Sequence, residues 1–156
     1  MADKIEFSIL GLEDVQRKMR GLVPKLRQKG AKSALGKAAA LVRKKAKENA
    51  LRVDDPETGR KISENIGQRL RGRYNRRTGN VMISVGVLTE RGRIPKGNPD
   101  EGKKGNTPHW HLIEEGTEQA AAQPFLRPAL SESIGQATDK FVTEFDKEID
   151  KALAQL

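Results

Sequence analysis

Two long segments with helical periodicity carry opposite charge, and this feature constrains the fold more than any other in the sequence. Residues 16–47 contain twelve Lys and Arg residues and no acidic residue, whereas residues 131–151 contain six acidic residues and three lysines. Helices with opposite charge attract each other across an interface, either within one chain or between copies. Two alternatives remain open: the basic helix faces DNA while the acidic one faces a basic neighbour, or both are solvated amphipathic faces.

The spacing of apolar residues predicts the extent of these helices. The first begins with Pro24 in its first turn, is rich in alanine and ends near Ala50. A shorter amphipathic helix, from Leu12 to Leu22, precedes it. The last helix runs from Pro128 to the C-terminus, with an apolar face made of Leu130, Ile134, Ala137, Phe141, Phe145, Ile149 and Leu153.

Alternation of apolar and polar residues predicts strands. Residues 4–10 form an N-terminal strand. Residues 69–74 and 80–88 read as a pair of strands joined by a turn over residues 75–79. Residues 109–114 form a further strand.

The order of these elements predicts an α+β fold in which a small antiparallel β-sheet packs against two long α-helices, one after the N-terminal strand and one at the C-terminus. A single domain covers residues 1–156. Within it, residues 91–107 form a long loop rich in Gly, Pro and Lys. Residues 62–66 suit either a single helical turn or the start of a strand.

Composition restricts the functional classes. The net charge of +9 and the pI near 9.9 favour an acidic partner such as nucleic acid. Only 35% of the residues are hydrophobic, so we expect contacts with neighbouring proteins to supply part of the stability. The absence of cysteine excludes disulfides and thiolate–metal sites. The sequence has neither a signal-peptide pattern nor an apolar run long enough to span a membrane.

Candidate catalytic and metal-binding groups are few. On the predicted strand, His109 and His111 share one face opposite Trp110, but a zinc site would need Glu114 or Glu115 as a further ligand. We therefore interpret the histidines as lining a subunit contact. Consecutive glutamates on a strand point to opposite faces and are unsuited to paired acid–base catalysis. No phosphate-binding loop or nucleophile elbow is present, so the sequence predicts no enzyme, cofactor or metal.

The segment from His109 to Leu130 is interpreted as a strand–turn–helix corner that positions one copy of the protein against another. The predicted assembly-corner residues are Trp110, Glu114, Gly116, Thr117, Pro124, Phe125, Leu126, Arg127 and Pro128. The residues predicted to face DNA or a subunit interface are Arg43, Lys44, Lys45, Lys47, Arg71, Arg73, Arg76 and Arg77.

Several landmarks resemble the tail-completion and tail-component family of neck proteins from long-tailed double-stranded DNA phages. His111–Thr117 is similar to an apolar stretch that ends in Glu-Phe-Gly-Thr in the family, with Glu115 in place of Phe. Gln123–Leu130 is the closest match. The N-terminal strand with Gly11-Leu12, the Ala-Lys-rich helix that ends at Ala46–Ala50, and Thr58-Gly59 also match the family pattern in order.

The resemblance implies a non-enzymatic structural virion protein of the phage neck or tail, assembled in the host cytoplasm. It implies a ring, commonly sixfold, that completes the tail and helps join it to the head. The implied partners are other copies of the chain, the tail terminator or tail tube, head-connector proteins and non-specifically bound DNA in the channel; no membrane is implied. The alternative is a sequence-independent nucleic-acid-binding protein, which the basic segment 16–47 suggests.

Overall fold

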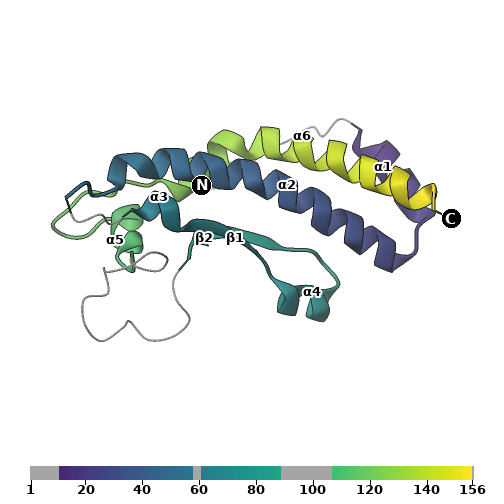
Figure 1. Ribbon diagram of the computed structural model, residues 1–156, viewed down its shortest axis with the longest axis horizontal. Coiled ribbons are helices and arrows are strands. Elements are labelled where there is room, and N and C mark those ends of the chain that lie inside the picture. Colours follow the sequence, from purple (N-terminus) through teal and green to yellow (C-terminus); the bar gives the residue numbers. More distant parts are fainter. Residues whose placement is uncertain (1–10, 58–60, 89–106, 156) are drawn as a thin grey trace. The chain divides into compact units, whose positions relative to one another are not determined.

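The computed structural model describes residues 11–57, 61–88 and 107–155. The predicted N-terminal strand, Thr58-Gly59 and nearly all of the predicted loop at 91–107 lie outside these residues. The elements follow one another in this order (Figure 1): α1 (Leu12–Arg20), α2 (Pro24–Ala50), a 3-10 turn η1 (Leu51–Val53), α3 (Ile62–Asn65), β1 (Ile66–Leu70), α4 (Gly72–Thr78), β2 (Ile83–Val87), α5 (Trp110–Glu115) and α6 (Leu126–Leu153).

The α+β class and both long helices are confirmed. Helix α2 has the predicted bounds, and α6 begins at Leu126, slightly before the predicted start. Within the described residues the sheet consists of β1 and β2. Its antiparallel pairing continues into the backbone hydrogen bonds Arg71 N–H to Met82 O and Leu88 N–H to Asn65 O. Residues 62–66, for which both a helical turn and a strand start were open, provide both: α3, then the start of β1.

The predicted hairpin is wrong in its first strand and its turn. Residues 72–78 form helix α4, not a strand and a tight turn. Gly79, with φ +76°, ends this helix as a left-handed cap whose N–H donates to the Asn75 carbonyl oxygen. Of residues 69–74, only the first two belong to a strand, the end of β1. Residues 75–79, which were predicted as the hairpin turn, contain the C-terminus of α4 and the glycine that ends it.

The predicted strand at 109–114 is also wrong, because Trp110–Glu115 forms helix α5. Gly116 ends it with φ +81° and donates its N–H to the Leu112 carbonyl oxygen. Six residues that alternate in polarity fit a strand and a helix about equally well. Here the helix is supported by a contact between Glu114 and the start of α6. Local periodicity cannot predict this contact, because its partners are more than ten residues apart.

Contacts divide the described chain into two compact units, and each is described by itself. Unit 1 contains residues 11–39, 70–83 and 134–155; unit 2 contains residues 40–57, 61–69, 84–88 and 107–133. Both α2 and α6 contribute residues to each unit. The single domain over 1–156 stays a prediction.

The core of unit 1 forms where α1, α2 and α6 pack together (Figure 1). Its buried members are Val15, Leu22, Ala34, Phe145 and Ile149. A Cβ atom at Gly30 would lie 3.3 Å from the ring of Phe145, so the missing side chain lets α2 approach α6 closely. The helix-weakening glycine thus has a packing role in this unit.

Ion pairs join the helices of unit 1 around Glu144, which is 6% exposed. Lys37 of α2 donates to its carboxylate at 2.5 Å, and Lys140 donates at 2.9 Å. These two hydrogen bonds, that of Lys37 first, lower the pKa of Glu144 to about 2. Nearby, Lys18 of α1 contacts Asp146 at 2.6 Å and Asp150 at 3.0 Å. Of the alternatives for the oppositely charged helices, attraction within one chain is therefore confirmed.

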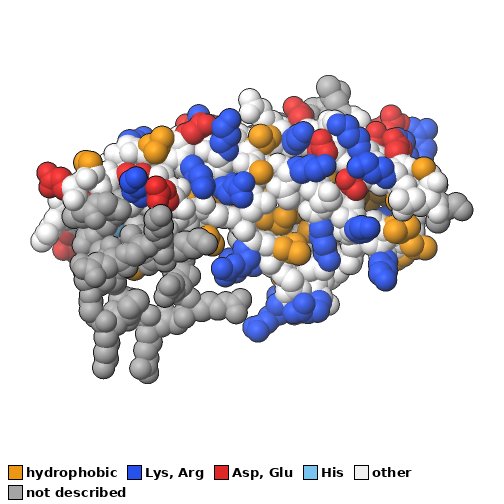
Figure 2. Space-filling model, viewed as in Figure 1, with side chains coloured by type: hydrophobic (Ala, Val, Ile, Leu, Met, Phe, Trp, Pro, Cys, Tyr) orange, Lys and Arg blue, Asp and Glu red, His pale blue; other side chains and the backbone are white. Residues whose placement is uncertain are grey.

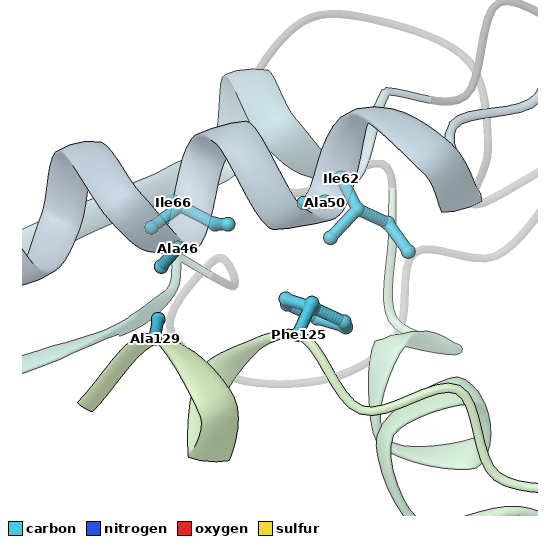
Figure 3. Close-up of a cluster of buried hydrophobic side chains, with 6 residues drawn as sticks. All are labelled: Ala46, Ala50, Ile62, Ile66, Phe125 and Ala129. Carbon is cyan, nitrogen blue, oxygen red and sulfur yellow. The ribbon is translucent and has the colours of Figure 1, made fainter. Parts of the chain in front are cut away.

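The core of unit 2 has Phe125 at its centre (Figure 3). Ala46 and Ala50 of α2 face it, together with Ile62, Ile66 and Ala129. The alanines of α2 have small side chains, which leave room for the phenyl ring. Phe125 is 0% exposed, so a large apolar side chain just before α6 fixes the start of that helix in this core.

Glu144 makes the stability of the chain sensitive to acid. Because folding lowers its pKa from 4.5 to about 2, its contribution is complete above pH 4.5 and is lost as the pH falls toward 2. We expect Glu144→Gln to lower Tm at neutral pH and to reduce the further loss of Tm between those values. Asp139→Asn is the control, since Asp139 lies exposed on the same helix without an ion pair to a described residue. Equal pH profiles of thermal unfolding for the two variants would contradict this role.

Candidate functional site

The segment predicted as a strand–turn–helix corner folds within unit 2 as helix α5, a loop and the start of α6, and the carboxylate of Glu114 organises it. The carboxylate of Glu114 lies at the N-terminus of α6, and the residue is 5% exposed. Its Oε2 accepts the backbone N–H groups of Phe125 at 2.7 Å and Leu126 at 3.0 Å, while Oε1 accepts that of Arg127 at 3.0 Å. Leu126 and Arg127 are the first two residues of α6 and Phe125 immediately precedes it; backbone N–H groups at a helix start lack partners inside the helix.

The electrostatics of this contact favour the ionised carboxylate. Burial raises the pKa of Glu114, but the three backbone hydrogen bonds together with the guanidinium of Arg127 outweigh it and hold the pKa below its usual value. The positive end of the α6 dipole acts in the same direction. Arg127 also donates through Nη2 to the Glu114 carbonyl oxygen at 3.0 Å, so one arginine contacts both the side chain and the backbone of Glu114.

The loop between α5 and α6 is folded back on itself. The Thr117 N–H donates to the Ala120 carbonyl oxygen at 2.9 Å, and its hydroxyl oxygen accepts the N–H groups of Gln119 and Ala120. A Cβ atom at Gly116 would lie 2.7 Å from the Ala122 nitrogen, and φ is positive there, so glycine is required. The Gln123 N–H donates to the Ile113 carbonyl oxygen at 2.8 Å, which returns the chain to α5.

Two side chains from the end of α2 and from η1 hold the other side of the corner. Arg52 donates to the carbonyl oxygen of Pro124, and Asn49 donates to that of Phe125 at 3.4 Å. The phenyl ring of Phe125, whose carbonyl oxygen Asn49 contacts, is itself buried in the unit 2 core. The corner is therefore fixed by hydrogen bonds from both sides and by apolar packing beneath.

The structure brings most of the predicted corner residues together. Glu114, Gly116, Thr117, Phe125 and Arg127 take part directly in the contacts above. Trp110 and Leu126 are partly buried against the core, and Pro124 and Pro128 are half-buried in the same segment. Their roles in assembly stay a prediction.

The histidines do not share one face of a strand. His109 immediately precedes α5, and His111 lies within the helix and is exposed. In helical geometry, side chains two residues apart point in directions that differ by more than half a turn, so the two imidazoles do not lie side by side. In the part of the chain that the structure describes, no group of three or more His, Asp or Glu side chains is placed to hold a metal ion.

The predicted basic residues fall into two groups. On α2, Lys45 pairs with Glu132 of α6 at 3.2 Å within unit 2, and its neighbours Arg43 and Lys47 are partly buried whereas Lys44 is exposed. The group on α4 and just before it belongs to unit 1 and is exposed: Arg71, Arg73, Arg76 and Arg77.

Sequence reasoning missed two contributors to the corner and misplaced one residue of α6. It did not identify Asn49 and Arg52 as donors to the backbone before α6, because their contacts cross more than 70 residues of sequence. It also placed Leu130 on the buried face of α6, where the structure leaves it 51% exposed beside the buried Ala129. The spacing of apolar residues by three or four positions alone could not distinguish these adjacent positions.

A known protein family matches about two thirds of the chain. The family described as "Bacteriophage HK97-gp10, putative tail-component" matches residues 13–116, from α1 to the glycine that ends α5. The chain belongs to the HK97-gp10-like family of bacteriophage tail components. No curated protein and no solved structure matches it.

The HK97-gp10-like match includes Glu114 and Gly116 but ends before Phe125 and α6. The capping carboxylate thus lies inside the matched region, and the helix N-terminus that it caps lies outside. None of the helices among the described residues combines the length and the apolar character needed to cross a bilayer.

We expect Glu114→Gln to destabilise the chain by about 1–3 kcal/mol, because it removes charge-assisted hydrogen bonds to buried N–H groups and turns an amide donor toward them. Glu115→Gln is the matched control: the neighbouring side chain is exposed and makes no ion pair with a described residue. Denaturant unfolding of both variants measures the difference. A loss as small for Glu114→Gln as for Glu115→Gln would show that the cap contributes little.

Proposed function

We propose that this protein is a structural component of the phage neck or tail that works by assembling with copies of itself and with other virion proteins, without catalysing a reaction. Its membership of the HK97-gp10-like family of tail components carries the proposal. In agreement with this, the buried Glu114 carboxylate is fully engaged as a helix cap, which is a structural task.

The corner of unit 2 supplies a surface suited to assembly. Leu112 on α5 is 48% exposed and Leu130 on α6 is 51% exposed, and both lie on elements joined by the Glu114 contact. Exposed apolar side chains on a fixed backbone bury area on association with little loss of conformational freedom. We propose that the corner contacts a neighbouring copy.

The contact that we propose is heterologous: the corner of one copy meets a different surface of the next. Such contacts close into a ring when the rotation between copies divides a full turn. The ring, sixfold by resemblance to the neck proteins, would complete the tail, adjoin the terminator or tube and the head connector, and surround the DNA channel in the virion.

Sequence-independent nucleic-acid binding is the second candidate, and the exposed arginines of α4 favour it. The two functions are compatible, because a ring around DNA also contacts phosphates. They differ in what the isolated chain does: a DNA-binding protein needs no ring, whereas a neck component must be present at the junction of head and tail.

Particles assembled without this chain provide the direct test of the proposed role. We expect electron microscopy to show unjoined heads and tails or incomplete tail ends, and complementation with the wild-type gene to restore joined particles. Normal, infectious particles without the protein would refute the proposal.

The role of the corner can be tested separately with Leu112→Glu combined with Leu130→Glu. We expect this variant to keep a Tm close to that of the wild type, because both side chains are exposed, and to fail in complementation. Val23→Glu combined with Leu153→Glu is the control, with the same change at exposed apolar positions of unit 1. If the control fails equally or the corner variant complements fully, the corner is not the assembly surface.

A further inference from the structure

The arginines of α4 differ from several basic residues of the long helices, because no carboxylate of a described residue binds Arg73, Arg76 or Arg77. Lys18 and Lys37 are bound by carboxylates of α6 within unit 1, and in unit 2 Lys45 is bound by Glu132. Residues 65–89, by contrast, contain no Asp or Glu. Arg73, Arg76 and Arg77 make no ion pair with any described residue. Their charge is therefore available to an external anion.

Helical spacing gathers these three side chains. Arg73, Arg76 and Arg77 are separated by three and four residues, so they project from one face of α4, and all three are exposed. Asn75 lies on another side of the helix and is buried. Figure 2 shows Lys and Arg side chains, and no acidic ones, gathered at the place of α4 in this view.

The backbone beneath this arginine face is held in place. The Asn75 side chain donates to the Asn80 carbonyl oxygen at 2.9 Å. Gln28 of α2 donates to the Gly79 carbonyl oxygen at 3.1 Å, and the Arg71 N–H donates to Met82 at 2.9 Å. Both ends of α4 are thus tied to other parts of unit 1, which orders the helix before any partner arrives.

We propose that the α4 face formed by Arg73, Arg76 and Arg77 binds the phosphate backbone of double-stranded DNA without reading its sequence. This inference rests on the proposed function and deepens it, because it names α4, in preference to the lysines of α2, as the DNA contact of the neck component.

Guanidinium groups suit this ligand, since each presents a planar fork of donors that matches two phosphate oxygens. The three residues that define this face are all charged, whereas the centre of a protein–protein interface is normally depleted of charged residues. The phosphates of a duplex repeat along its axis, so a cluster of cations can bind in many registers. These features favour DNA over an acidic protein surface.

The test compares the full-length chain with Arg73→Gln/Arg76→Gln/Arg77→Gln in binding a labelled random duplex across about 50–200 mM salt. Each lost phosphate contact removes about 0.9 from the slope of log affinity against log salt, so we expect a decrease of roughly 2–3 and at least about tenfold weaker binding at the lowest salt. The control, Lys25→Gln/Lys29→Gln/Lys44→Gln, removes the same charge from exposed residues of α2. We expect it to change the slope by less than about 1.

Equal losses in the two triple variants would overturn the proposal in favour of diffuse attraction by the net charge. An α4 variant that binds DNA like the wild type, or that loses only self-association in sedimentation, would also overturn it and would make α4 a protein interface. If the triple variant fails to fold, the three single Arg→Gln variants take its place, each expected to lower the slope by about 0.9. Normal particles without the chain, together with the predicted slopes, would refute the neck role and leave the DNA site standing.

Discussion

The carboxylate of Glu114 at the first turn of α6 is the interaction on which the candidate site depends. A buried carboxylate is costly unless it is paired and hydrogen-bonded, and here three backbone N–H groups and the guanidinium of Arg127 compensate it. The contact also satisfies donors that a helix start would otherwise leave without partners. It thereby fixes α5 against α6, and the backbone between them, including the glycine at 116, follows from that constraint.

Charge pairing has a similar structural role elsewhere in the chain. In unit 1, carboxylates of α6 bind the ammonium groups of Lys18 and Lys37, and in unit 2 Glu132 binds Lys45. The net charge of +9 is therefore a poor guide to where an anionic partner binds, because part of the basic sequence is neutralised within the protomer. An external anion is bound most readily by Lys and Arg side chains that are not already paired with carboxylates of the protomer.

The long helices, the shorter helix before them and the opposite charges of α2 and α6 could be predicted from the sequence, since repeated apolar spacing and charge blocks are local patterns. The short elements could not. Strands were predicted at residues 69–74 and 109–114, yet helices form over residues 72–78 and 110–115, and each ends at a glycine with positive φ. Helix α5 is held by the contact of Glu114 with residues 11–13 positions later, and on α6 it is Ala129 that packs in the core with Phe125, while Leu130 is exposed. Both are tertiary effects. The sequence did predict the chain reversal before α6, because its glycine, threonine and Pro-Phe-Leu-Arg segment are typical of one, but it predicted a strand where α5 lies, and the assembly role of this segment stays a prediction.

The ordered corner has a consequence for assembly. A surface loop that becomes ordered only on association lowers affinity by the free energy of its ordering. The loop between α5 and α6 is already held by Glu114, by the Thr117 turn and by the bonds from Asn49 and Arg52. The hydrogen bonds of the cap hold the pKa of Glu114 below its usual value, so they favour the ionised carboxylate that accepts them. In the assembly that we propose, the exposed leucines would meet a neighbour on a backbone that no longer needs to be ordered.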